Sequence, residues 1–118
     1  MTTALVEADS AAASELIAAA PGIVLVDLTA EWCGPCKMLT PVLEQLDREA
    51  DDLTVVQVDV DASPELASAH QVMSFPTLLF FVEGRPVHRL VGARGIGSLR
   101  EELHRVRTVA ARTTATES

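Results

Sequence analysis

The sequence lacks any hydrophobic run long enough to cross a lipid bilayer. Hydrophobic residues make up 48% of its 118 positions, but they occur in short, interrupted stretches, whereas a spanning helix needs about 20 consecutive apolar residues. Cationic side chains are also few. Nine Lys and Arg stand against 17 Asp and Glu, giving a net charge of -8, which repels nucleic-acid phosphates and anionic lipid head groups. We therefore expect a soluble protein with no nucleic-acid and no membrane partner.

The first 20 residues contain no Lys or Arg, so they lack the basic start of a secretory signal. This absence predicts a cytoplasmic location. Cysteine is scarce as well, because Cys33 and Cys36 are the only two in the chain. In a reducing compartment, two close cysteines are more often catalytic or metal-binding than a structural staple.

The hydrophobic pattern switches several times between helical and strand periods. Asp9 or Ser10 can cap the first helix, Ser63 can cap a short one, and Ser98 with Glu101 forms a capping box before the last. The expected helices lie at 10–20, 34–50, 64–70 and 98–108, and the expected strands at 23–28, 53–60, 77–82 and 86–91.

Helices and strands that alternate and close on a hairpin predict an α/β fold. We expect three layers, α/β/α, with a central mixed sheet that ends in an antiparallel hairpin. Residues 1–108 then form a single domain. The small and polar residues of 109–118 predict a flexible C-terminal tail.

Cys33 and Cys36 are expected one turn apart at the start of a helix, so their side chains lie on the same face. Their Cα atoms are then about 5 Å apart, a separation that a disulfide tolerates. Cys33 lies ahead of the helix, where unpaired N–H groups and the positive end of the helix dipole favour a thiolate. We therefore expect Cys33 to be the nucleophile. Cys36 lies one turn in, faces the core, and resolves the mixed disulfide that forms at Cys33.

Two other roles for the cysteine pair remain open at this point. As a structural disulfide it closes a very short loop, which stabilises by only about 2 kcal/mol against about 4.7 for a 100-residue loop. As a zinc site it needs further ligands, and His70, His88 and His104 are the three histidines of the chain. Their spacing differs from that of the usual zinc-binding histidine pairs, so we expect no metal.

The residues from Trp32 to Lys37, Trp-Cys-Gly-Pro-Cys-Lys, resemble the active-site motif of the thioredoxin family. The similarity extends from about Ile17 to Leu103 and includes Phe75-Pro76-Thr77 and Val91-Gly92-Ala93. The resemblance implies the thioredoxin fold and a monomeric protein-disulfide reductase without a cofactor. It also implies thioredoxin reductase and disulfide-containing target proteins as partners.

The resemblance also assigns roles to single residues. Asp27 matches a buried aspartate that relays a proton to or from the resolving cysteine, and burial in an apolar strand should raise its pKa. Pro76 matches a cis-proline that lies against the cysteines. Pro35 and Lys37 support the active site. The residues that match the flat target-docking surface around Cys33 are Trp32, Gly34, Pro35, Phe75, Gly92 and Ala93.

Each of these assignments has a plainer alternative. Asp27 could be an exposed charge at a strand edge, Pro76 a trans proline that starts a strand, and Trp32 a core aromatic. The sequence also departs from the family pattern. Thr29 stands where a second tryptophan is usual, and Gln57 stands where many members have a lysine near the buried aspartate. Without that cation, Asp27 loses an electrostatic partner and burial should raise its pKa further.

Two other functions stay open on the sequence. The chain could be a non-catalytic binding module that uses the docking surface, or a dithiol oxidase or isomerase. Related folds differ in redox direction, and the potentials of such proteins, thioredoxin among them, span about 150 mV. Gly34 and Pro35 between the cysteines resemble the reducing members.

Overall fold

The computed structural model describes residues 5–117, and the side chains of 5–112. Its centre is a five-stranded sheet in the order β1-β3-β2-β4-β5. The strands are β1 (Val6–Glu7), β2 (Ile23–Thr29), β3 (Leu53–Asp59), β4 (Thr77–Val82) and β5 (Arg85–Val91). The helices are α1 (Ser10–Ala19), α2 (Gly34–Glu49), α3 (Glu65–Ala69) and α4 (Ile96–Glu117).

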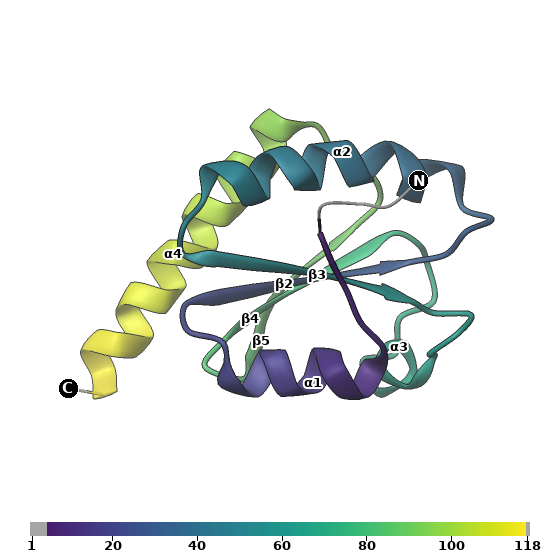
Figure 1. The fold of residues 1–118 in the computed structure, drawn as a ribbon. Helices are drawn as coiled ribbons and strands as arrows, with labels where there is room; N and C mark the ends of the chain where they lie inside the picture. Colours follow the sequence, from purple (N-terminus) through teal and green to yellow (C-terminus); the bar gives the residue numbers. More distant parts are fainter. Residues whose placement is uncertain (1–4, 118) are drawn as a thin grey trace.

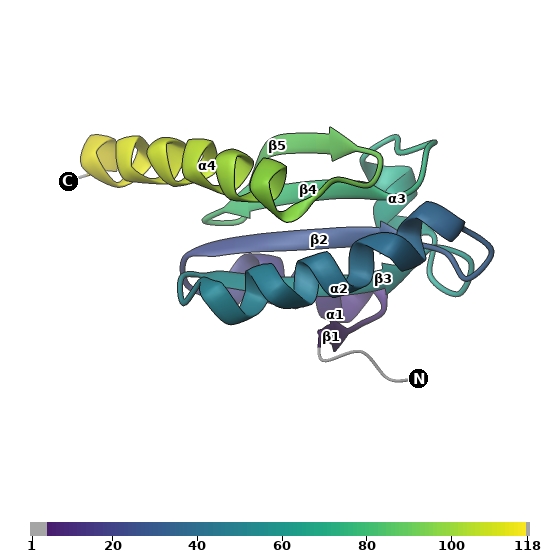
Figure 2. The same cartoon turned by 90° about the horizontal axis from the view of Figure 1, so that it is seen from above.

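The helices cover the two faces of the sheet in pairs. Figure 1 shows α2 above the sheet and α1 and α3 below it, while α4 begins beside α2 and slants down past the end of the sheet. Leu99, Leu103 and Val106 of α4 share a core with the buried leucines of α2. Figure 2 shows the strands side by side. β1, β3 and β2 run parallel, whereas β4 is antiparallel to both β2 and β5. The expected three-layer fold with a mixed sheet and a final hairpin is therefore confirmed.

Strand β2 lies at the centre because both of its faces are apolar. Leu25 belongs to the core under α2 and α4, and its neighbour Val26 belongs to the core against α1 and α3. Successive side chains of a strand point to opposite faces. Asp27 therefore points to the α2 face, in the middle of a strand whose residues are almost all buried. The carboxyl group of Asp27 is thus held in the interior of the protein, on the side of the sheet that α2 covers.

The structure adds one strand that the sequence did not indicate and corrects one cap. The two-residue strand β1 pairs with Val56 and Gln57 of β3, and it is too short to show a period. Ser63 does not cap α3. Its hydroxyl instead accepts a hydrogen bond from the Ser10 backbone N–H (2.8 Å), while the Ser10 hydroxyl accepts one from the Leu66 N–H (3.1 Å). The two serines thus join the starts of α1 and α3.

Helix α4 is longer than predicted at both ends. It begins at Ile96, so the capping box expected at Ser98 is wrong, and the Ser98 hydroxyl accepts a bond from Arg94 instead. The helix also continues to Glu117. Its apolar face of Leu103 and Val106 extends to Ala110, which packs against the core. The mobility expected for 109–118 stays a prediction, and Ser118 lies outside the described residues.

Candidate active site

The two cysteines lie where the chain leaves the central strand and enters α2. Cys33 is the N-cap residue of α2, and Pro35 occupies its first turn, where the missing N–H of proline is of no consequence. The two cysteines form a disulfide, with their Cα atoms 5.3 Å apart. The Cys36 backbone N–H donates a hydrogen bond to Cys33 Sγ over 3.2 Å. A backbone N–H at the start of the helix, which has no partner within the helix, therefore points at Cys33 Sγ.

Burial distinguishes the two sulfur-bearing residues only slightly. Cys36 is completely buried, and Cys33 is 4% exposed. Both cysteines are therefore buried, and Cys33 is the slightly more exposed of the two. The carbonyl oxygen of Phe75 lies 3.6 Å from Cys33 Sγ.

Phe75 comes from the loop that leads into β4, and the Phe75–Pro76 peptide bond is cis. The Gly92 N–H donates to the Pro76 carbonyl over 2.9 Å. This bond brings the segment with Gly92 and Ala93 alongside the proline loop. The docking residues expected from the resemblance are thus gathered from three separate parts of the chain.

Trp32 lies on the surface, so the alternative of a core aromatic is wrong. Its side chain is 68% exposed, and its ring packs edge to face on Phe75 with the centroids 6.2 Å apart. The indole N–H donates to Asp61 Oδ2 over 2.7 Å. Sequence reasoning missed Asp61, and it also missed the apolar side chain of Met73, which is 90% exposed two residues before Phe75.

Asp27 is completely buried, which excludes an exposed charge at a strand edge. Burial raises its pKa from the usual 3.8 to about 6, while a hydrogen bond from Gln57 acts in the opposite direction. Its Oδ2 accepts that bond from Gln57 Nε2 over 3.0 Å. Its Oδ1 has no hydrogen-bond partner among the described residues. A carboxyl group with such a pKa can exchange a proton near neutral pH.

Gln57 also reaches a residue that sequence reasoning did not single out. Its Nε2 donates a second bond, to Thr40 Oγ1, over 3.0 Å, and the Thr40 hydroxyl donates to the Cys36 carbonyl over 3.3 Å. The spacing could have revealed Thr40, since residues four apart lie on one face of a helix.

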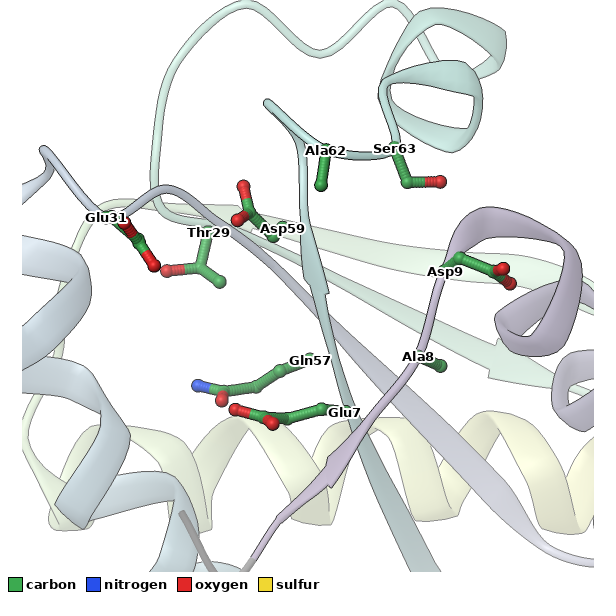
Figure 3. A pocket seen from close by; sticks show the side chains of 9 residues that line it. All are labelled: Glu7, Ala8, Asp9, Thr29, Glu31, Gln57, Asp59, Ala62 and Ser63. Atoms are coloured by element: carbon green, nitrogen blue, oxygen red, sulfur yellow. The ribbon is translucent and has the colours of Figure 1, made fainter. Parts of the chain in front are cut away.

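A pocket of about 450 Å³ opens beside this network, and Thr29 and Gln57 form part of its wall. Figure 3 shows Glu7 and Gln57 projecting from the paired strands β1 and β3 in the same direction. Asp9, Glu31 and Asp59 add three further carboxylates to the lining, and neither cysteine belongs to it. The pocket therefore borders the site but does not contain the sulfurs.

His70 and His88 are engaged in contacts of their own. The His70 ring packs against Phe81, and His88 pairs with Glu102. Among the described side chains, those of residues 5–112, no group of three or more His, Cys, Asp or Glu is arranged to hold a metal ion. Within residues 5–117, no helix is both long and apolar enough to span a bilayer.

Comparisons with known proteins agree with this geometry. A family model described as thioredoxin matches residues 4–105. The thioredoxin of Mycobacterium bovis is 57% identical over 81 residues, which make up 68% of this chain and 70% of that protein. A bifunctional thioredoxin reductase/thioredoxin of Mycobacterium leprae is 52% identical over 81 residues, 68% of this chain but only 18% of that protein. The structure of a mutant thioredoxin from Halobacterium salinarum has a TM-score of 0.76 at 33% identity, covering 86% of this chain and 90% of that one.

A cysteine pair that closes within one helical turn can take up or release two electrons with little backbone movement. On this fold, such a pair defines the class of thiol–disulfide oxidoreductases. The chain belongs to the thioredoxin family, and its activity is the reduction of protein disulfides.

Proposed function

We propose that the chain, as a monomer in the cytoplasm, donates electrons to the disulfides of several target proteins, and that a thioredoxin reductase restores its dithiol. The Mycobacterium leprae relative supports this partner, because its name joins a thioredoxin reductase and a thioredoxin in one chain. The Gly34-Pro35 pair between the cysteines favours the reducing direction.

In this proposal Cys33 is the nucleophile. The observation that carries the assignment is the hydrogen bond from the Cys36 N–H to Cys33 Sγ at the start of α2. A thiolate at that point is stabilised by the donor and by the positive end of the helix dipole. Cys33 then attacks one sulfur of a target disulfide, forms a mixed disulfide with it, and releases the other target sulfur as a thiolate.

Cys36 completes the reaction as the resolving cysteine. Asp27, buried on the same side of the sheet as α2, takes the proton of the Cys36 thiol. The Cys36 sulfur then attacks Cys33 Sγ, the Cys33–Cys36 bond forms, and the bond from Cys33 to the target breaks. The target leaves with two more electrons than it brought, and the protein is left as the disulfide seen in the structure.

The target docks on the surface around Cys33 as an extended segment. The Phe75 carbonyl lies 3.6 Å from Cys33 Sγ, so a segment that pairs with Phe75 brings its own cystine beside Cys33. Gly34, Gly92 and Ala93 keep the approach open, and Trp32 offers an exposed ring beside it. Pro35 and Lys37 support the site from α2, where the Lys37 N–H donates to the Cys33 carbonyl over 3.3 Å.

The direct test compares Cys33→Ser and Cys36→Ser in the reduction of insulin by dithiothreitol. We expect Cys33→Ser to abolish the catalysis. Reduced Cys36→Ser, freed of dithiothreitol before insulin is added, should stall with insulin bound covalently at Cys33, visible as a mixed disulfide by mass spectrometry. Full activity of Cys33→Ser would contradict the nucleophile assignment. A binding module would catalyse no reduction even as the unmodified protein, and a dithiol oxidase would equilibrate with glutathione at a much less reducing potential.

A further inference from the structure

The Asp27 carboxyl group is connected to the backbone of Cys36 by consecutive hydrogen bonds. Asp27 and Gln57 are register partners on β2 and β3, so their side chains lie on the same face of the sheet, under α2. Gln57 Nε2 carries two hydrogens, and both are used, one toward Asp27 Oδ2 and one toward Thr40 Oγ1, each over 3.0 Å. The Thr40 hydroxyl donates onward to the Cys36 carbonyl.

This arrangement makes the two oxygens of Asp27 different. Oδ2 accepts the Gln57 amide, whereas Oδ1 is buried and without a partner among the described residues. A buried carboxylate oxygen without a donor is costly, and a proton on it removes the charge. Oδ1 is therefore the atom on which a proton is best held.

We propose that Gln57 and Thr40 are positioning residues that hold Asp27 Oδ2, so that Oδ1 is the oxygen that exchanges a proton with the Cys36 thiol. The inference rests on the proposed function, in which Asp27 takes that proton. In the resolving step the proton moves from Cys36 Sγ to Asp27 Oδ1. The electron pair left on Cys36 Sγ forms the bond to Cys33 Sγ, and the target sulfur leaves with the pair of the broken bond.

A neutral amide suits this task because it orients the carboxylate without fixing its charge. An ammonium group in the same place would favour the ionised form much more strongly. Among the described residues that line the pocket beside Gln57, none is a Lys or Arg. Leu78 of β4 lies opposite Asp27 in the sheet, and Glu7 of β1, Asp59 of β3 and Glu31 line the pocket that Gln57 borders.

Thr40 provides the sharper test because its hydrogen bonds go to Gln57 and to the Cys36 carbonyl, and not to the Asp27 carboxyl group or a sulfur. Thr40→Val keeps the shape of the side chain but removes the acceptor for Gln57, and Thr40→Ser keeps the hydroxyl. Gln57→Leu removes the whole connection. Thr54→Val, also on β3 and outside the network, is the matched control. Asp27 is titrated in each oxidised protein through the 13C shift of its carboxyl carbon, so that no thiol contributes.

The expected titration midpoints follow from the loss of one neutral hydrogen bond to the carboxylate. Gln57→Leu should raise the midpoint of Asp27 by about half to one pH unit. Thr40→Val should also raise the midpoint of Asp27, but by less than Gln57→Leu does. Thr40→Ser and Thr54→Val should leave the midpoint of Asp27 unchanged. The rate of the resolving step, measured on a preformed mixed disulfide, should shift its pH profile in step with the titration.

Two results would overturn the inference. One is a Thr40→Val protein that titrates as the unmodified protein does, and the other is a Thr40→Ser protein that behaves like Thr40→Val. Failure of the proposed function would look different. It would leave the unmodified protein without insulin reduction at any pH, while the titration of Asp27 in the oxidised variants would still report whether Thr40 and Gln57 hold the carboxyl group.

Discussion

The backbone N–H of Cys36 points at Cys33 Sγ from 3.2 Å, across the first turn of α2. The same turn therefore joins the two sulfurs and supplies the donor that stabilises negative charge on one of them. The sulfur that the helix start favours as a thiolate belongs to Cys33, the slightly more exposed of the two buried cysteines. Local backbone geometry thus makes two chemically identical side chains differ, as the roles proposed for Cys33 and Cys36 require.

Stability should fall as Asp27 ionises. Its pKa is raised from 3.8 to about 6 by burial, so the folded protein holds this proton more tightly than the unfolded chain. The stabilising contribution is complete below pH 3.8 and is lost as the pH rises through about 6. Asp27→Asn should therefore be the more stable protein at pH 8, by about 3 kcal/mol.

Urea unfolding of the oxidised proteins at pH 4 and pH 8 measures this difference. Asp51→Asn, at an exposed position between α2 and β3, is the control and should unfold like the unmodified protein at both pH values. An equal stability of Asp27→Asn and the unmodified protein at pH 8 would show that the buried carboxyl group carries no such penalty.

Trp32→Ala should impair target reduction with little loss of stability. The ring is 68% exposed, so its removal should lower the free energy of unfolding by less than about 1 kcal/mol. The KM for insulin should rise severalfold, because the docking surface loses its large aromatic ring. Met38→Ala, an exposed substitution on α2, is the comparison for a general loss of exposed apolar area. Unchanged KM in Trp32→Ala would remove the ring from the docking surface.

Gly22→Ala should destabilise the fold more than Gly84→Ala. Both glycines have positive φ, +76° and +79°, so alanine is strained by about 1–2 kcal/mol at either position. Only at Gly22 would the new Cβ also meet an obstacle, the Asp52 carbonyl oxygen at 2.5 Å. That oxygen already accepts the Ile23 N–H at the start of β2. Thermal unfolding of both variants measures the difference, and equal losses would contradict the predicted clash.

Ser10→Ala and Ser63→Ala should destabilise the protein by about 1 kcal/mol each, since each removes a capping bond at a helix start. The two hydroxyls also contact each other over 3.0 Å, so the losses should not add. A double-mutant cycle by urea unfolding measures the coupling. Strictly additive losses would mean that the serines stabilise α1 and α3 independently.

The elements that could be predicted are those whose residue pattern is compatible with only one type of secondary structure. The apolar run of β2 and the strong stripe of α2 specified buried elements, and the Glu83-Gly84 turn specified the hairpin of β4 and β5. The first and last residues of the helices were harder to predict than the helices themselves. Ser98 looks like a cap, yet α4 begins two residues earlier, because the capping pattern does not say which of two nearby starts packs better.

The site was predictable as far as the motif reached. The cysteines, Asp27 and Phe75 with Pro76 all follow from residues that stand in recognisable order along the chain. The bonds from Gln57 to Thr40 and from Trp32 to Asp61 do not. They join residues 17 and 29 positions apart, and such contacts depend on how α2 and the loops settle on the sheet.

The acidity of Cys33 in the reduced protein tests the whole account most directly. Alkylation by iodoacetamide across a pH range of about 5 to 9, followed by peptide mapping, yields the thiolate fraction of each cysteine separately. We predict that Cys33 reacts first, with a midpoint well below the value of about 8.5 of a free cysteine. A midpoint of Cys33 at that ordinary value, or faster alkylation of Cys36, would contradict the account.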